Sequence, residues 1–229
     1  MKKKIMFIIL FSILVLMASF SIMYLNSSYE VNKDLGDVDL TNINKLMIVA
    51  HPDDESIWGG AHLLEDDYLV VCITCGTNRL RVLEFDKAMS ITHDKYVMLG
   101  YPDKTGGKRN DWSKVEDDLF WELEKIIDYK NWELIVTHNP EGEYGHFHHI
   151  KTNEIVTFLA DNEKLMYFGK YFSKRSYQKV DGVIPKISDK LYKKKTEKLL
   201  KVYKTQGFIM NTFDQMFPHE DFIKATDWR

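Results

Sequence analysis

The sequence has little cysteine, no large excess of one charge and no glycine-rich phosphate loop. Its two cysteines, Cys72 and Cys75, lie in one apolar run. Side chains three residues apart on a strand point to opposite faces, about 10 Å apart, so we expect buried thiols and no disulfide. The formal net charge of −3 gives no broad surface for nucleic acid. No Gly-x-Gly-x-x-Gly follows the first predicted strand, which argues against a dinucleotide site.

The rest of the sequence is typical of a globular domain. Its 229 residues are 45% hydrophobic and 28% charged, enough for a sizeable core. Short apolar runs predict strands at 46–50, 68–75, 96–99, 133–137 and 165–172. Apolar residues at three- and four-residue steps predict helices at 56–65, 79–92, 113–129, 147–161 and 188–205. This alternation predicts an α/β fold, a Rossmann-like three-layer sandwich with a mainly parallel sheet.

The N-terminus has a different character. Lys2–Lys4 precede an uncharged, almost wholly apolar run at 5–25, and about twenty helical residues at 1.5 Å each span the hydrocarbon core of a bilayer. Residues 26–40 carry more acids than lysines, so the positive-inside rule places the rest of the chain outside the cytoplasm. A cleaved signal peptide is the alternative, and the domain would then be secreted. The predicted organisation is a membrane anchor at 1–25, a linker at 26–44 and one domain at 45–229.

Two polar turns follow predicted strands of this sheet. His51-Pro52-Asp53-Asp54-Glu55 comes directly after the first strand. Residues 138–152 follow the fourth strand and hold four of the eight histidines, namely His138, His146, His148 and His149. Ligands of parallel sheets collect at the carboxyl ends of the strands. We therefore expect the two turns to meet in space.

These side chains suit a catalytic metal site. Zinc binds imidazole nitrogen and carboxylate oxygen, and a catalytic site keeps one position for water. His51 and Asp54, together with a histidine from 146–149, would give two histidines and one carboxylate. Asp53 would then be a spare acid beside the metal-bound water and could act as a general base. Nearby donors such as His146 or Tyr144 could stabilise an oxyanion, so the set predicts hydrolysis of an acyl bond.

The same residues resemble a known family. The stretch AHPDDE followed by Gly59-Gly60, with GHFHHI at 145–150, is similar to the PIG-L/LmbE-type zinc-dependent N-acetylglucosamine deacetylases. Weaker similarities extend over residues 45–206. They are RVLEFDKA at 81–88, LGYPD at 99–103 and KLLKVYKTQ at 198–206.

The resemblance implies a role for each matching residue. It implies zinc, or ferrous iron, on His51, Asp54 and His149, with Asp53 as the base. His146 and Tyr144 would hold and protonate the reacting acetamide, and Arg81 and Asp103 would hold sugar hydroxyls. The chain departs from the family at His148, where many relatives have an acid, so His148 could also join the metal site. The implied substrate is an N-acetylated sugar, glycan or glycolipid.

Two other functions fit parts of the sequence. A non-catalytic metal- or glycan-binding module would bind the metal without turnover, but would not need the second carboxylate, Asp53. A sugar-nucleotide transferase on the same fold is disfavoured, because the acid-rich turn at 51–55 would repel a phosphate unless a metal intervened. The oligomeric state is left open.

Overall fold

The computed structural model describes the chain except for residues 1–5, 7–10, 18–34, 181 and 183. Contacts divide the chain into two units, Met1–Glu30 and Val31–Arg229, and both polar turns lie in the second. Most of the predicted anchor, at 5–25, lies outside the described residues; within it, residues 11–17 are helical. Among the residues that the structure describes, no helix has the length and apolar character needed to cross a membrane.

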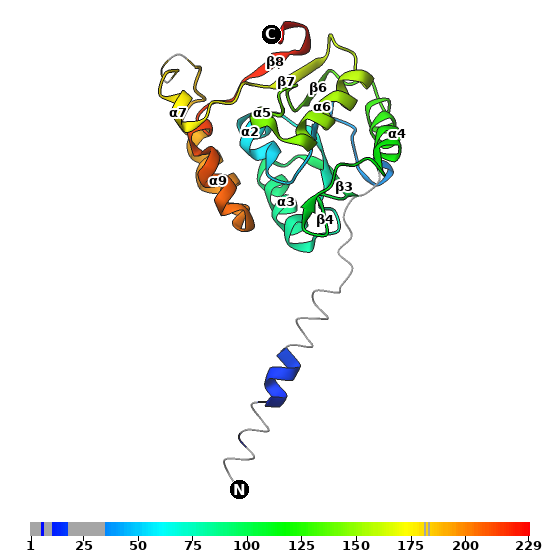
Figure 1. The fold of residues 1–229 in the computed structure, drawn as a ribbon, viewed down its shortest axis with the longest axis vertical. Helices are drawn as coiled ribbons and strands as arrows, with labels where there is room; N and C mark the ends of the chain where they lie inside the picture. Colours follow the sequence, from blue (N-terminus) through cyan, green and yellow to red (C-terminus); the bar gives the residue numbers. More distant parts are fainter. Residues whose placement is uncertain (1–5, 7–10, 18–34, 181, 183) are drawn as a thin grey trace. The chain divides into compact units, whose positions relative to one another are not determined.

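A six-stranded sheet forms the centre of the second unit (Figure 1). Its order is β3-β2-β1-β6-β7-β8. The bounds are β1 (Lys45–Val49), β2 (Tyr68–Thr74), β3 (Lys95–Tyr101), β6 (Leu134–Thr137), β7 (Leu165–Phe168) and β8 (Phe222–Lys224). The first five of these strands pair in parallel, and β8 is antiparallel at the edge. The mainly parallel sheet and its five predicted strands are confirmed, whereas β8 was not predicted.

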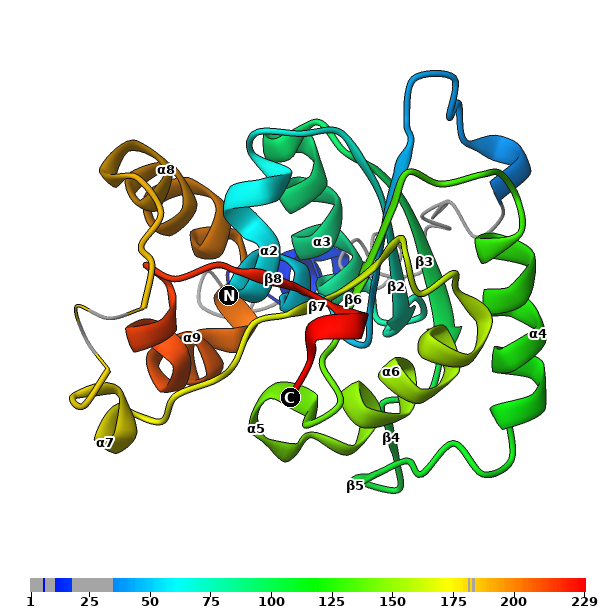
Figure 2. The same ribbon diagram turned by 90° about the horizontal axis from the view of Figure 1, so that it is seen from above.

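Helices cover both faces of this sheet (Figure 2). The main ones are α2 (Asp54–Leu63), α3 (Arg79–Thr92), α4 (Glu116–Ile127) and α6 (Phe147–Leu159). Alternate residues of β1 point to opposite faces of the sheet. Leu46 and Ile48 pack in the core with α4 and α6. Met47 and Val49 pack with α2 and α3. Both faces of the strands are therefore buried, as the predicted layered α/β fold requires.

The remaining elements are short. They are η1 (Leu35–Asp37), β4 (Lys104–Thr105), β5 (Lys108–Arg109), α5 (Gly142–Gly145), α7 (Lys174–Tyr177), α8 (Asp189–Lys194), α9 (Gly207–Phe213), η5 (Asp214–Met216) and η6 (Ala225–Asp227). The helix predicted at 188–205 is not one regular helix. After α8 the chain passes through a π-helical segment, Lys195–Leu199, and two 3₁₀ segments, Leu200–Val202 and Lys204–Gln206. The irregular segment begins at Lys195, a lysine with no exposed surface.

The strand order explains where the two polar turns meet. From β1 the chain moves outward through β2 and β3, and later returns to add β6 on the other side of β1. Ile48 of β1 lies opposite Thr137 of β6, and the Thr137 hydroxyl donates a hydrogen bond to the Ile48 carbonyl at 2.9 Å. The order in which strands are added to the sheet reverses between β1 and β6, and ligands of open α/β sheets bind at such a position. Both cysteines are free thiols, and Cys72 in β2 is buried, as predicted. Cys75 is instead only partly buried, because it follows the strand with a left-handed φ of 68°.

Candidate metal centre

The turn after β1 is strained and is held from inside the protein. Asp53 has a φ of 129°, in the region that favours glycine, immediately before Asp54 opens α2. The Glu55 carboxylate accepts a hydrogen bond from the Asp53 N–H at 3.0 Å. It also accepts the hydroxyls of Ser56 and Tyr203. Because Glu55 is fully buried, this network fixes the turn and the direction of the two aspartates.

The turn after β6 also contains left-handed backbone. Gly142 has a φ of 62°, and a Cβ there would lie 2.7 Å from the Ile150 side chain, so glycine is required. Glu143 follows with a φ of 56° and points its carboxylate into the protein. That carboxylate lies 2.9 Å from His138 Nδ1 and 2.5 Å from His149 Nδ1. One buried acid therefore holds two of the histidines that the sequence singled out.

Three side-chain atoms from the two turns form a nearly regular triangle. His51 Nδ1 and Asp54 Oδ2 are 3.1 Å apart, Asp54 Oδ2 and His149 Nε2 are 3.2 Å apart, and His149 Nε2 and His51 Nδ1 are 3.3 Å apart. Ligands bonded at about 2.0–2.1 Å to a tetrahedral ion lie roughly 3.3 Å from one another. The sides of the triangle therefore match the ligand spacing of zinc or a similar divalent cation.

The outer hydrogen bonds of the triangle support this fit. A carboxylate only accepts, so His149 donates its Nδ1–H to Glu143, and its Nε2 faces the Asp54 carboxylate inside the triangle at 3.2 Å. Although burial lowers it, the carboxylates of Asp54 and Glu143 raise the pKa of His149 to about 10, so without a metal Nε2 carries a proton directed at Asp54. On its outer side, His51 Nε2 lies 3.0 Å from His148 Nδ1. A divalent cation inside the triangle would take the place of this proton.

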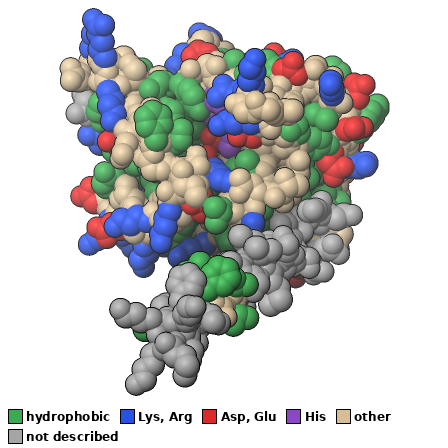
Figure 3. All heavy atoms as spheres, turned by 60° about the horizontal axis from the view of Figure 1, so that its bottom comes forward, with side chains coloured by type: hydrophobic (Ala, Val, Ile, Leu, Met, Phe, Trp, Pro, Cys, Tyr) green, Lys and Arg blue, Asp and Glu red, His purple; other side chains and the backbone are tan. Residues whose placement is uncertain are grey.

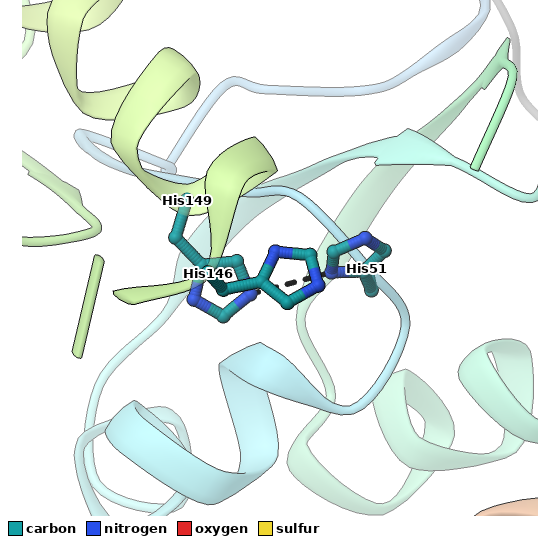
Figure 4. A group of neighbouring side chains, drawn as sticks. All are labelled: His51, His146 and His149. Atoms are coloured by element: carbon teal, nitrogen blue, oxygen red, sulfur yellow. Dashed lines mark hydrogen bonds between the residues drawn. The ribbon is translucent and has the colours of Figure 1, made fainter. Parts of the chain in front are cut away.

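Two further histidines lie beside the triangle. His138 is fully buried, and its Nε2 accepts the Ala50 N–H at 2.9 Å, so this lone pair is already used. His146 lies between the two ligand histidines, and Figure 4 shows its ring together with those of His51 and His149. The ring centroids are 4.7 Å from His51 and 4.4 Å from His149. His146 Nδ1 is buried without a hydrogen-bond partner among the described residues, while the residue itself lines the pocket described next.

A pocket of about 620 Å³ opens over these side chains. Seven of the eight predicted site residues line it: His51, Asp53, Asp54, Arg81, Asp103, Tyr144 and His146. The eighth, His149, lies beneath them without exposed surface. In Figure 3 a histidine is visible beside acidic and basic side chains in a hollow of the surface. The structure thus brings all eight residues to one place.

The lining residues differ in how freely they face the pocket. Tyr144 is 39% exposed, with its ring 5.7 Å from that of His146. Asp103 Oδ1 lies 3.6 Å from His51 Nε2. Arg81 is only 7% exposed and its guanidinium is largely engaged within the protein. It donates to the Pro52 carbonyl and forms ion pairs with Asp53 at 3.4 Å and with Glu84 at 3.2 Å.

The two adjacent aspartates have opposite electrostatic surroundings. Burial raises the pKa of Asp53 well above its usual value, and the nearby Arg81 only partly opposes this effect. Burial also acts on Asp54, but there the neighbouring His149 and His51 outweigh it and hold the pKa well below its usual range. Asp54 is thus suited to remain an anionic ligand, and Asp53 to exchange a proton.

Glu143 and the structural role of His148 were not predicted from the sequence. Glu143 lies in a loop between the histidines, where an acid beside glycines is typical of an exposed turn. Its contacts with His138 and His149 span five and six residues, which matches no helical or strand period. The sequence indicated His148 only as a possible metal ligand. Its hydrogen-bond partner is the backbone carbonyl of Asn110, 38 residues away, which no local sequence pattern reveals.

Comparisons with known proteins relate the chain to a family. A family model described as PIG-L: GlcNAc-PI de-N-acetylase matches residues 46–160, half of the chain, and this range contains both turns. The uncharacterized protein L374 of Acanthamoeba polyphaga mimivirus is 28% identical over 193 residues, covering 72% of this chain and 84% of that protein. A 1D-myo-inositol 2-acetamido-2-deoxy-alpha-D-glucopyranoside deacetylase of Corynebacterium diphtheriae is 27% identical over 159 residues, covering 54% of each chain.

Solved structures share the fold at low sequence identity. The zinc-inhibited form of teicoplanin deacetylase Orf2 matches with a TM-score of 0.56 and 14% identity, covering 75% of this chain and 90% of that one. The 4-carboxy-2-hydroxymuconate hydratase GalB of Pseudomonas putida matches with a TM-score of 0.54 and 11% identity, covering 76% and 84%. Deacetylases and a hydratase therefore share this architecture, and the reaction has to be argued from the site.

Proposed function

Because the chain belongs to the PIG-L family, we propose that it is a metal-dependent hydrolase that removes an N-acetyl group from an N-acetylglucosamine-type sugar, glycan or glycolipid. The observation that supports this best is the triangle of His51 Nδ1, Asp54 Oδ2 and His149 Nε2, with sides of 3.1 to 3.3 Å. A second carboxylate, Asp53, lines the same pocket beside it. A binding site alone has no use for this additional acid, whereas a hydrolase needs a base.

His51, Asp54 and His149 would hold the metal, with zinc as the proposed ion and ferrous iron as the alternative. A divalent cation there would polarise the acetamide carbonyl and make a neighbouring water more acidic. Asp53 accepts a proton from the water that attacks the carbonyl carbon, and returns it to the nitrogen as the C–N bond breaks. The products are acetate and the free amine.

Other pocket residues would bind the substrate. His146 and the half-exposed Tyr144 line the pocket, where they would donate hydrogen bonds to the acetamide oxygen. Asp103 is available to sugar hydroxyls at the pocket wall. Arg81 would bind sugar hydroxyls only through guanidinium N–H groups that its ion pairs with Asp53 and Glu84 leave available. A pocket of about 620 Å³ accommodates a mono- or disaccharide.

The test combines metal content with acetate release from a panel of N-acetylated amino sugars and glycans. Removing the metal with a chelator should abolish acetate release, and adding Zn²⁺ or Fe²⁺ should restore it. We expect Asp53→Ala to keep the metal and lose about 10²–10⁴-fold in rate, because the general base is gone. His51→Ala should lose both metal and activity, and Asp67→Ala, which alters an exposed acid, should change neither.

Two results would contradict the proposal. Full activity in Asp53→Ala would remove the assigned base. A chain that binds one metal ion but releases no acetate from any N-acetylated sugar would instead be a metal- or glycan-binding module.

A further inference from the structure

We infer that His148 is a positioning residue that fixes the tautomer of His51, so that the lone pair of His51 Nδ1 faces the metal site. This inference rests on the metal site of the proposed function. It gives a role to the histidine at which the chain departs from its family. The hydrogen bonds run from His51 through His148 to the backbone carbonyl of Asn110.

The direction of each hydrogen bond follows from the fixed acceptor at the end. His148 Nε2 lies 2.7 Å from the Asn110 carbonyl oxygen, which can only accept, so His148 donates its Nε2–H there. Nδ1 of the neutral ring is then an acceptor. His51 Nε2, at 3.0 Å, must therefore carry the proton that it shares with His148 Nδ1. His51 Nδ1, which lies 3.1 Å from the Asp54 carboxylate, is then the ring nitrogen whose lone pair is left for a metal.

The ring of His148 is held firmly in this orientation. It has no exposed surface and stacks on Trp112, with ring centroids 4.2 Å apart and planes 3° apart. The Trp112 indole N–H donates to the Pro102 carbonyl at 2.8 Å, and the Trp112 backbone N–H donates to the Asn110 side chain at 2.7 Å. The stacking partner and the carbonyl acceptor are thereby fixed relative to each other.

A competing interpretation is a second cation between His51, Asp103 and His148, whose ligand atoms also lie near one another. The distances favour the hydrogen bond. Asp103 Oδ1 is 3.6 Å from His51 Nε2 and 3.9 Å from His148 Nδ1, beyond hydrogen-bond length, while the two ring nitrogens are 3.0 Å apart. A second cation would also require His51 to lose both ring protons.

The test compares two substitutions, each of which replaces one of the two ring nitrogens of His148 with a polar atom in a similar position. The side-chain oxygen of His148→Asn lies near the position of Nδ1 and can still accept from His51. The amide of His148→Gln reaches the position of Nε2, keeps the contact with Asn110 and leaves Nδ1 without a replacement. His93→Asn and His93→Gln are the matched controls, because His93 is exposed and has a left-handed φ of 71° that asparagine tolerates.

Two readouts are needed, both on the full chain. The first is Co²⁺ affinity, followed by visible absorption. We expect His148→Gln to weaken Co²⁺ binding by about 10–100-fold, His148→Asn to retain most of the affinity, and the His93 variants to match the wild type. The second is the ¹⁵N NMR signature of the His51 ring in the metal-free wild type, where we expect Nε2 to carry the proton that it shares with His148 Nδ1.

The NMR measurement keeps the inference testable if a variant fails to fold. A wild-type His51 without a proton on Nε2 would overturn it, as would His148→Gln with wild-type Co²⁺ affinity. Two Co²⁺ ions per chain, with one lost in Asp103→Asn, would assign these residues to a second metal site instead. If the wild type binds no Co²⁺ at all, the proposed function fails, and the tautomer of His51 still decides the role of His148.

Discussion

Glu143 connects the fold of the second turn to the chemistry of the metal site. Although burial raises the pKa of its carboxyl, the neighbouring His138 and His149 lower it to about 2, so the group is anionic. It accepts hydrogen bonds from both imidazoles and, at 3.0 Å, from the Asn139 N–H. The carboxylate thus orients His149 and simultaneously ties the turn to the end of β6.

We expect Glu143→Gln to weaken metal binding by about 10–100-fold, because a neutral amide holds the His149 tautomer less firmly than a carboxylate. The free energy of unfolding should also fall, by about 1–3 kcal/mol, through the poorly satisfied buried group. Isothermal titration with Zn²⁺ and urea unfolding measure the two effects. Glu141→Gln, at an exposed position two residues earlier, is the control. Unchanged affinity in Glu143→Gln would show that His149 is oriented by other contacts.

At the scale of elements, α2 is joined to the C-terminal region by a buried ion pair. Glu220 accepts the backbone N–H groups of Ala61 at 2.8 Å and of His62 at 3.2 Å. Lys195 donates to the Ile57 carbonyl at 2.7 Å and to Glu220 itself. The pair therefore satisfies backbone groups of the helix that opens with Asp54, and neither side chain is exposed.

We expect Lys195→Met to lower the free energy of unfolding by about 3–5 kcal/mol, because it leaves the buried Glu220 carboxylate with only His62, at 3.0 Å, as an ionisable partner. Adding Glu220→Gln should recover part of this loss, since the unpaired charge is then removed. Chemical unfolding of both variants, beside the exposed Lys193→Met, measures the effect. If the double variant is no more stable than Lys195→Met, charge burial is not the cause.

The elements differ in how well the sequence predicts them. The strands from β1 to β7 in the central sheet are apolar and bounded by polar turns, so their period and position are visible. The late helical region was predicted as one helix because its apolar spacing is regular, but spacing does not reveal that Lys195 turns inward to an acid 25 residues away. The two-residue strands β4 and β5 are exposed and leave no hydrophobic pattern.

The residues of the candidate site were also only partly predictable from the sequence. His51, Asp54 and His149 could be selected because two turns at one sheet edge must meet. The hydrogen-bond partners behind them could not, because they depend on loop backbone such as the left-handed Glu143. Nor could the sequence indicate that Arg81 is occupied by Asp53 and Glu84.

At the scale of the whole molecule, Asp94 makes the stability of the second unit depend on pH. Burial raises the pKa of this carboxyl to about 7, while Oδ1 accepts the Tyr68 N–H at 2.7 Å and Oδ2 has no partner among the described residues. In the unfolded chain the pKa is about 4. The folded state thus binds the additional proton, and its stabilising contribution is lost as the pH rises from about 4 to about 7.

We expect Asp94→Asn to keep the hydrogen bond from Tyr68 and to remain neutral at every pH. Its stability relative to the wild type should therefore increase between pH 4 and pH 7 and then level off, by up to about 4 kcal/mol at about 1.4 kcal/mol per pKa unit. Urea unfolding of both proteins at several pH values tests this. Asp128→Asn, at an exposed position after α4, should show no such trend. A stability difference that is constant with pH would exclude a raised pKa at Asp94.

The apolar run at 5–25 leads to a prediction about the location of the protein in the cell. Three lysines before it and the acids of 26–40 after it favour a helix that crosses the bilayer with the domain outside, where a cell-surface glycan or glycolipid would be within reach. We expect the full chain in the membrane fraction, and protease added to intact cells should digest residues 45–229. A chain lacking residues 1–25 should leave the membrane. Protection of the domain from protease in intact cells would place the catalytic pocket on the cytoplasmic side, and recovery of the full chain in the soluble fraction would exclude the anchor.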